Sequence, residues 1–318
     1  MSDLADKKHA RETRPRATGE LVAALQGVVG VEVFLLEPMS RHTSYCLGGP
    51  ADVLIQPRSL ESLQHVVRIL TELGEQPLVV GRGTNVVVRD KGIRGVVLKI
   101  SEGLSGIEED GTRLRVLAGT PLMQVCAYAA CRGLAGLEML AGVPGALGGA
   151  VAMNAGTSSG CIEALVVKVE CLDHEGRWLE LDRTAAGFET RNSRVRREGL
   201  IVGAVELELA QGKPLEIEAA MLEQLERRAA KQPLSRPSCG SVFKRPPGHY
   251  AGALVESAGC KGMRVGGVEV SRKHANFIVN LGNGEASDVL RLIDEVRHRV
   301  WEYAHVVLEP EVIVRGEL

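Results

Sequence analysis

Residues 78–88, LVVGRGTNVVV, place a glycine-containing turn between two short runs rich in β-branched apolar residues. Such runs favour β-strands, and no helical pattern follows the turn. The turn consists of Gly81, Arg82, Gly83, Thr84 and Asn85. Successive backbone N–H groups in a turn of this kind can bind an anion, and glycine lets a ligand approach the main chain closely. The stretch predicts strand, turn and strand, with the turn either a pyrophosphate site or an ordinary tight loop.

The sequence on both sides of this stretch predicts alternating strands and helices. Residues 51–56 have the pattern of a strand, and Ser59 then offers an N-cap for a helix that ends at Gly74. Residues 96–100 and 113–117 have the composition of two further strands. Together these segments predict a mixed α/β fold.

The C-terminal half continues this mixed pattern. Residues 166–172 and 178–181 predict a β-hairpin, and residues 210–214 predict a polar linker before a helix over 218–231. Ser287 is the expected N-cap of the last long helix.

Composition excludes several classes of protein. The 318 residues include 38 Lys and Arg against 40 Asp and Glu, so no strong positive field is available for nucleic acid or an acidic membrane. The seven cysteines are odd in number and contain no CxxC pair, which argues against a disulfide framework or a zinc site and favours a reducing cytoplasm. The first twenty residues lack the apolar core of a secretory signal.

An uncharged segment at residues 139–155 is too short and too often interrupted by glycine and proline for a membrane span. It is expected to be either a buried packing turn or a main-chain surface that wraps a large flat ligand. The ligand-lining candidates are Gly142, Pro144, Gly148, Gly149 and Asn154.

Other polar residues carry weaker signals. Ser241 lies in CGSVFKRP (239–246), where a hydroxyl precedes two cations. This pattern suits acid chemistry beside a phosphorylated substrate, and it is also typical of a loop with solvated cations. Arg191 belongs to a basic run whose simplest interpretation is a solvated surface. For His274 a structural role, and for Glu311 a surface carboxylate, is the simpler interpretation.

Six segments, taken in order, resemble the UDP-N-acetylenolpyruvoylglucosamine reductase family of peptidoglycan synthesis, in its shorter class. They are TSYCLGGPA (43–51), GRGTN (81–85), GLEMLAGVPGALGGAVAMNAG (136–156), SCGSVFKRP (238–246), KHANFIVN (273–280) and LEPEV (308–312). Each alone is weak, but their shared order and spacing are specific.

The resemblance implies an FAD-binding fold of the vanillyl-alcohol oxidase type, built from two subdomains, and a C-terminal α+β substrate-binding domain. The expected divisions are an N-terminal extension that is partly disordered (1–33), subdomain 1 (34–100), subdomain 2 (101–212) and the substrate domain (213–318), whose last strand returns to subdomain 1. The glycine turn would then hold the FAD pyrophosphate, and the segment from Gly142 to Asn154 would line the flavin.

The resemblance also implies a reaction. NADPH passes a hydride to FAD, and the enolpyruvyl ether of UDP-N-acetylglucosamine then receives it. By family motif Arg191 and a protonated Glu311 stabilise the enolate-like carboxylate, and Ser241 donates the proton. The expected substrate-binding residues are Lys231, Arg245, Lys261 and His274. No metal, nucleic acid or membrane partner is implied.

The sequence departs from the family pattern at three positions. Thr84 stands where many members have serine, Thr190 precedes Arg191 where tyrosine is common, and Arg245 replaces a common asparagine. No tyrosine-bearing insertion is present, so a different element is expected to close over the substrate. Two alternatives remain open on the same residues: a flavin oxidase of an alcohol or hydroxy acid, and a non-catalytic nucleotide-binding module.

Overall fold

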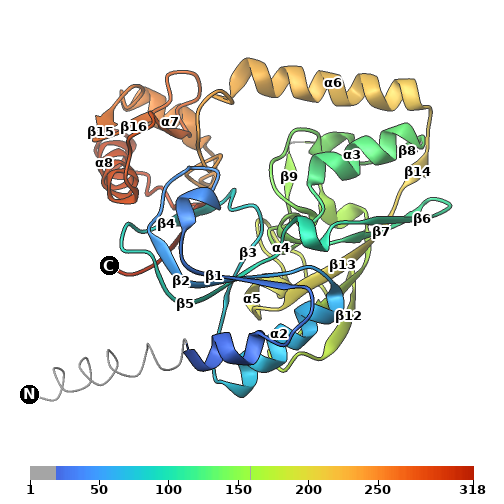
Figure 1. Ribbon diagram of the computed structural model, residues 1–318. Coiled ribbons are helices and arrows are strands. Elements are labelled where there is room, and N and C mark those ends of the chain that lie inside the picture. Colours follow the sequence, from blue (N-terminus) through green and yellow to red (C-terminus); the bar gives the residue numbers. More distant parts are fainter. Residues whose placement is uncertain (1–18, 158) are drawn as a thin grey trace, which may run out of the picture. The chain divides into compact units, whose positions relative to one another are not determined.

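The computed structural model describes residues 19–157 and 159–318 (Figure 1). The chain divides into two compact units. In the described part, unit 1 comprises residues 19–36, 52–81 and 95–221, and unit 2 comprises residues 37–51, 82–94 and 222–318. The predicted N-terminal extension lies outside the described residues up to residue 18; beyond it, a helix covers residues 19–25.

The first sheet has the strand order β1-β2-β5-β3 and lies mostly in unit 1. Its strands are β1 (Val31–Pro38), β2 (Pro50–Pro57), β5 (Ile93–Lys99) and β3 (Leu78–Val80). Helix α2 (Leu60–Glu72) begins as the sequence predicts, because the Ser59 hydroxyl accepts a hydrogen bond from Ser62 N and the Ser62 side chain bonds back to Ser59.

The second sheet of unit 1 is antiparallel, with the order β12-β11-β13-β7-β6. Its strands are β12 (Trp178–Asp182), β11 (Val166–Leu172), β13 (Ile201–Glu208), β7 (Arg113–Leu117) and β6 (Ile107–Asp110). The predicted hairpin is confirmed, and the Asp173 carboxylate closes its turn by accepting from the backbone N–H groups of Glu175 and Arg177.

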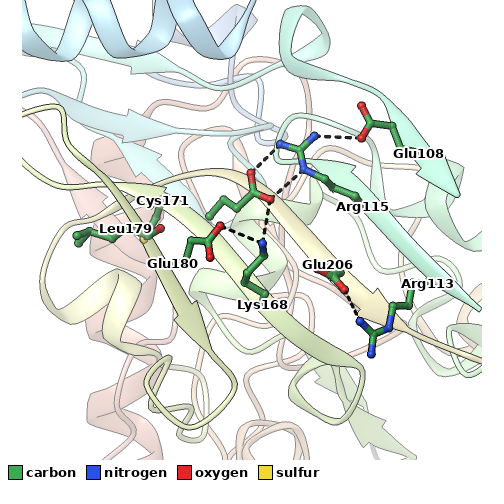
Figure 2. Close-up of polar contacts among 9 residues, drawn as sticks. Glu108, Arg113, Arg115, Lys168, Cys171, Leu179, Glu180 and Glu206 are labelled. Carbon is green, nitrogen blue, oxygen red and sulfur yellow. Dashed lines mark hydrogen bonds and ion pairs between the residues drawn. The ribbon is translucent and has the colours of Figure 1, made fainter. Parts of the chain in front are cut away.

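One face of this sheet carries a charged network, shown in Figure 2. The Arg115 guanidinium donates to both oxygens of Glu170, at 2.9 and 2.6 Å, while Lys168 donates to Glu180 at 3.0 Å. Alternate residues such as Val169 and Val116 point the other way and are buried. We call the exposed side, with Arg113, Arg115, Lys168, Glu170, Glu180 and Glu206, the charged sheet face.

Helices and short strands complete unit 1. They are α3 (Leu122–Cys131), α4 (Leu147–Ala152), α5 (Arg194–Arg197), and the pairs β8 (Leu134–Ala135) with β14 (Ala210–Gln211) and β9 (Gly156–Thr157) with β10 (Gly160–Cys161). The polar linker predicted at 210–214 is therefore wrong in part. Its first two residues form β14, whose partner lies more than 70 residues earlier in the chain.

Unit 2 has a three-stranded antiparallel sheet, β15 (Arg264–Val265), β16 (Val268–Val270) and β17 (Ile278–Asn280), and a parallel pair, β4 (Val86–Val88) with β18 (Ile313–Arg315). Helices α7 (Ala251–Ser257) and α8 (Ala286–Ala304) accompany them. Helix α6 (Pro214–Lys231) begins in unit 1 and ends in unit 2. Apolar side chains of α7, α8 and β16 share one core.

The predicted N-cap of α8 is wrong by two residues. Glu285 is the N-cap, and its side chain and that of Asp288 form a capping box. Ser287 N instead donates to the Asp90 carboxylate at 2.9 Å, and Ala286 N donates to the same carboxylate at 2.7 Å. A carboxylate at a helix N-terminus also interacts favourably with the helix dipole, so Asp90 removes the need for a serine cap.

Candidate active site

The glycine turn of unit 2 packs against the segment before β2. Gly83 has φ +62, and a Cβ at this position would lie 2.1 Å from the carbonyl oxygen of His42. Ser44 N donates to Gly83 O at 3.1 Å. Only glycine fits here, because the backbone is left-handed and a second main chain approaches it closely. Of the predicted turn residues, Arg82 to Asn85 lie in unit 2 and Gly81 lies in unit 1.

Asn85, the last residue of this turn, is bound to the chain around Glu311. Its side-chain nitrogen donates to Glu311 O at 3.3 Å, and its carbonyl oxygen accepts from Ile313 N at 3.0 Å. The parallel pairing of β4 with β18 begins at the next residue, Val86. The structure therefore brings one predicted cofactor-binding residue and one predicted catalytic residue into the same small region.

The Ser241 loop joins this region. Glu311 N donates to Val242 O at 2.7 Å, so the residue next to Ser241 is hydrogen-bonded to Glu311. Asn276 fixes the loop, because its amide donates to Phe243 O at 2.9 Å and accepts from Phe243 N at 3.0 Å. Ser241 and Glu311 are both half-buried. The predicted proton donor and the predicted carboxyl group are thus held on adjacent segments.

Asn276 is a supporting residue of the site that the sequence interpretation did not single out. It lies in the KHANFIVN motif and is 7% exposed. A buried amide with both of its polar atoms bonded to one backbone position is a rigid support. Its position within the motif was the sequence signal that could have identified it. Its partner Phe243 lies 33 residues away, so no local pattern predicts the hydrogen bonds between them.

A group of cations occupies another part of unit 2. His274 is affected electrostatically by Lys261 and Lys231, and Lys273 donates to the carbonyl of Ala229 in α6. We call Lys231, Lys261, Lys273 and His274 the basic cluster. Glu256 of α7 pairs with Lys261 at 2.6 Å. Three of the four predicted substrate-binding residues therefore belong to this cluster. Lys231 comes from the end of α6, Lys261 from the region after α7, and His274 from the segment before β17.

His274 has a defined tautomer when its ring is neutral. Burial lowers the pKa of His274, so the neutral ring is favoured at pH 7. Asn276 N donates to His274 Nδ1 at 3.2 Å, which makes Nδ1 the acceptor and leaves the hydrogen on Nε2. A Cβ at Gly252 would lie 3.3 Å from the ring's Cε1, so a glycine there gives the ring room. His274 is therefore suited to donate a neutral hydrogen bond.

Arg245, the fourth predicted substrate-binding residue, forms a different contact. Its guanidinium lies 4.1 Å from the ring centre of Tyr250, and its Nε donates to His249 O at 3.3 Å. Tyr250 is 65% exposed. Stacking on an aromatic ring orders an exposed arginine while leaving its charge available.

The glycine-bent segment of unit 1 turns into a short helix, α4. A Cβ at Gly148 would lie 2.8 Å from the Ala118 Cβ, whereas a Cβ at Gly149 would have nothing within 4 Å. Gly148 is buried and Gly149 is exposed. Gly148 therefore serves close packing, whereas Gly149 and Pro144 are exposed.

The Arg191 loop is attached to this segment. The Arg191 guanidinium donates to Gly156 O at 3.1 Å. The Asn154 amide donates to Glu163 Oε2 at 2.7 Å and to Glu189 O at 3.0 Å, so Asn154 ties the loop to its neighbours. Arg191 has φ +57, a left-handed conformation that costs free energy in a residue other than glycine. Such strain is typical of functional loops.

The predicted residues therefore fall into two groups. Unit 1 holds Gly81, Gly142, Pro144, Gly148, Gly149, Asn154 and Arg191, and unit 2 holds Arg82, Gly83, Thr84, Asn85, Lys231, Ser241, Arg245, Lys261, His274 and Glu311. In unit 2 Asn85 is hydrogen-bonded to Glu311 O, and in unit 1 Asn154 is hydrogen-bonded to Glu189 O in the Arg191 loop.

The residues fit a flavin nucleotide. A Cβ at Gly81 would meet only Ile100 O, at 3.9 Å, and a Cβ at Gly149 would meet nothing within 4 Å, so each glycine leaves main chain that a ligand can approach. The described helices include none that is both long enough and apolar enough to cross a bilayer.

Comparisons with known proteins agree with this geometry. Residues 51–182 match a domain family described as FAD binding domain, and residues 232–315 match the C-terminal domain of UDP-N-acetylenolpyruvoylglucosamine reductase. These matches define the class: the chain is a flavin-dependent oxidoreductase with the expected FAD-binding fold.

Relatives of known name specify the family. The reductase of Moorella thermoacetica is 45% identical, covering 93% of this chain and 98% of its own, and that of Halalkalibacterium halodurans is 38% identical, covering 94% and 99%. A crystal structure of UDP-N-acetylenolpyruvylglucosamine reductase from Thermus caldophilus superposes with a TM-score of 0.77 at 36% identity, covering 90% of this chain and 98% of its own. The chain belongs to the UDP-N-acetylenolpyruvoylglucosamine reductase family.

Proposed function

We propose that this protein reduces the enolpyruvyl ether of UDP-N-acetylglucosamine to UDP-N-acetylmuramate with NADPH, in the cytoplasm, as a step of peptidoglycan synthesis. The observation that carries the proposal is the 45% identity to a named reductase along nearly the whole of both chains. When bound, FAD would supply the hydride chemistry that connects NADPH with the enolpyruvyl methylene carbon.

The protein's task is to make an electron-rich enol ether accept a hydride. Negative charge must move into the adjacent carboxylate as the new C–H bond forms. A guanidinium and a protonated carboxyl group would stabilise that charge, and Arg191 and Glu311 are assigned these roles. The hydrogen bond from Arg191 to Gly156 and the bonds around Glu311 N and Asn85 support fixed positions for both residues within their own units.

Ser241 is assigned the proton that completes the reduction at the neighbouring carbon. The assignment is supported by its half-buried position and by the hydrogen bond that joins Val242 to Glu311. A serine hydroxyl is a weak acid, so proton donation requires a carbanion-like centre that Arg191 and Glu311 hold in place until the proton arrives.

The substrate's nucleotide diphosphate is assigned to the basic cluster and to Arg245. Lys231 and Lys261 offer ammonium groups to phosphate oxygens, and His274 offers a neutral Nε2–H. Arg245 stacked on Tyr250 presents a bidentate donor from a loop rather than from an insertion. We also assign to Arg245 and Tyr250 the closure over the substrate, which in this shorter class cannot come from the tyrosine-bearing insertion.

Spectral titration without oxygen tests the function. Purified protein should be yellow, NADPH should bleach the flavin absorbance, and the UDP-sugar should restore it with stoichiometric UDP-N-acetylmuramate detected by mass spectrometry. Bleaching of the flavin by an alcohol or hydroxy acid and recovery of the absorbance by oxygen, with no effect of the sugar, would identify an oxidase. Binding of FAD and UDP without any turnover would identify a non-catalytic module.

A further inference from the structure

Arg228 has an unusual environment on helix α6. Its Nε is buried and has no hydrogen-bond partner among the described residues. Burial alone lowers the pKa of its guanidinium. A cation removed from water is unfavourable unless an anion or several acceptors compensate it. The free protein therefore holds a guanidinium whose desolvation is not balanced at Nε.

The neighbouring arginine shows the contrast. Arg227 is exposed and pairs with Glu223 at 2.6 Å, one turn earlier on the helix. The corresponding positions before Arg228 are Gln224 and Leu225, which provide no carboxylate. The two adjacent arginines thus have different surroundings. Arg227 forms a solvated ion pair, as is usual for arginine, whereas the Nε of Arg228 is buried without a partner among the described residues.

The C-terminal turn of α6 places Arg228 beside the basic cluster. Lys231 follows three residues later, so it lies on the same face about 4.5 Å further along the axis. Lys273 donates to Ala229 O, the carbonyl that follows Arg228 in sequence, and Lys231 influences His274. The groups that gather around this turn are therefore mainly of the same sign as Arg228.

A cation near a helix C-terminus also interacts favourably with the helix dipole. That interaction is available to exposed side chains such as Arg227 and Lys231, so it does not require a buried Nε. The buried, unbonded Nε of half-buried Arg228 calls for a second explanation.

We propose that Arg228 is an anion-binding residue, and that its guanidinium, with Lys231, binds the diphosphate of a nucleoside diphosphate. A planar guanidinium suits phosphate oxygens, and the spacing of one helical turn lets two cations contact one diphosphate. The assignment rests on the proposed function, in whose reaction three ligands carry such a group: the UDP-sugar, FAD and NADPH. Ligand binding then compensates the buried charge.

The experiment compares R228M, R228K and the control R227M, each as the full-length protein. Melting temperature is measured for FAD-free protein, and dissociation constants are measured by calorimetry for FAD and, in the holoenzyme, for UDP and for NADP⁺. We expect R228M to melt at a higher temperature than the wild type when free of ligand, because an uncompensated charge is lost. We also expect it to bind at least one of the three nucleotides at least about 10-fold more weakly, with R228K intermediate and R227M unchanged.

The three ligands separate the sources of the diphosphate. Weaker binding of UDP or of NADP⁺ with unchanged FAD binding assigns Arg228 to whichever of these two ligands is weakened, and weaker FAD binding assigns it to the flavin cofactor. Unchanged affinity for all three nucleotides in R228M, or in R228K if R228M does not fold, would overturn the proposal. Turnover of the UDP-sugar by the wild type is measured separately, so an inactive wild type would refute the proposed function and leave the Arg228 result readable.

Discussion

The charged sheet face of unit 1 and the basic cluster of unit 2 both contain partly buried cations, and they balance them differently. On the sheet, Arg115 is paired with Glu170 and Glu108, and Lys168 is paired with Glu180. In the basic cluster, burial together with the charges of Lys261 and Lys231 lowers the pKa of His274, and Glu256 is the carboxylate that pairs with Lys261. Arg228 beside them has an orphaned Nε.

This difference indicates that the paired charges of the sheet face stabilise the fold, whereas the cations of the basic cluster are available to a ligand. Hydrogen bonds to Glu170 help raise the pKa of Arg115, whereas burial lowers the pKa of Arg228. A self-satisfied network gains nothing from an added anion, while a concentration of like charge becomes favourable only when one binds. Substitutions on the sheet should therefore change stability, and substitutions in unit 2's site should change turnover.

The largest effect is expected for Ser241→Ala. Loss of the proton donor should slow flavin reoxidation by the UDP-sugar about 10²- to 10⁴-fold, while bleaching by NADPH keeps its rate. Stopped-flow absorbance measures both half-reactions, and Ser235→Ala, an exposed serine earlier in the same loop, serves as the control. Equal slowing of both half-reactions would indicate a disturbed flavin rather than a missing proton.

A change on the charged sheet face should affect stability instead. Glu170→Gln should lower the free energy of unfolding by about 1–2 kcal/mol at pH 7, because Arg115 loses its two-point partner in a setting that solvent partly screens. The hydrogen bond from Arg115 lowers the pKa of Glu170 below its ordinary 4.5. The wild-type advantage is thus complete above pH 4.5 and disappears as the pH falls through the lowered value.

Urea denaturation at about pH 7 and about pH 3 checks this prediction. Glu108→Gln is the matched control, since its carboxylate contacts the same Arg115 at 3.3 Å but is 74% exposed, and it should cost less than about 0.5 kcal/mol. A wild-type advantage that persisted unchanged in acid would show that the Glu170 charge is not its source. Turnover should be normal in both variants.

Gly149→Ala should separate stability from cofactor binding in unit 1. Alanine is favoured over glycine in a helix by about 1 kcal/mol, and a Cβ at this position meets nothing within 4 Å. We expect the FAD-free protein to become more stable and its FAD affinity to fall. Thermal melts and fluorescence titration with FAD measure the two effects.

Gly148→Ala is the control for that experiment, because its Cβ would lie 2.8 Å from the Ala118 Cβ and should destabilise the protein. If Gly149→Ala stabilised the protein and bound FAD as well as the wild type does, α4 would not be part of the flavin surface.

The smallest effect is expected for Lys244→Met. Lys244 pairs with Glu309 at 3.1 Å, and both side chains are more than half exposed. Exposed pairs contribute little, so the free energy of unfolding should change by less than about 0.5 kcal/mol. UDP affinity should also stay unchanged, in contrast to Arg245→Met. A large loss of UDP affinity in Lys244→Met would extend the anion site to this residue.

Local chemistry in the sequence was enough to predict parts of the fold. Ser59 caps α2 as expected, and the hairpin of β11 and β12 closes through Asp173. The predictions that failed depended on distant partners. The segment 210–214 gains a strand only by pairing with β8, and the cap of α8 moves because Asp90, 196 residues from Ala286, reaches its first turn.

The same distinction applies to the candidate site. Motifs indicated Ser241 and Glu311, and the structure places their segments side by side through Val242. Asn276 and Arg228 were not singled out, because their importance arises from partners made or missing after folding. The assigned catalytic and binding roles, like the domain boundaries at 33, 100 and 212, stay predictions.

Unit 2 is assembled from three stretches of chain, and this affects its synthesis. Among the described residues, the strand partner of β4 is β18, which begins at Ile313, so β4 leaves the ribosome long before its partner exists. Because an unpaired strand edge is prone to wrong contacts, the nascent protein depends on the late synthesis of β18 to close this unit. Loss of residues 313–315 would therefore leave β4, an early part of the chain, exposed to misassembly.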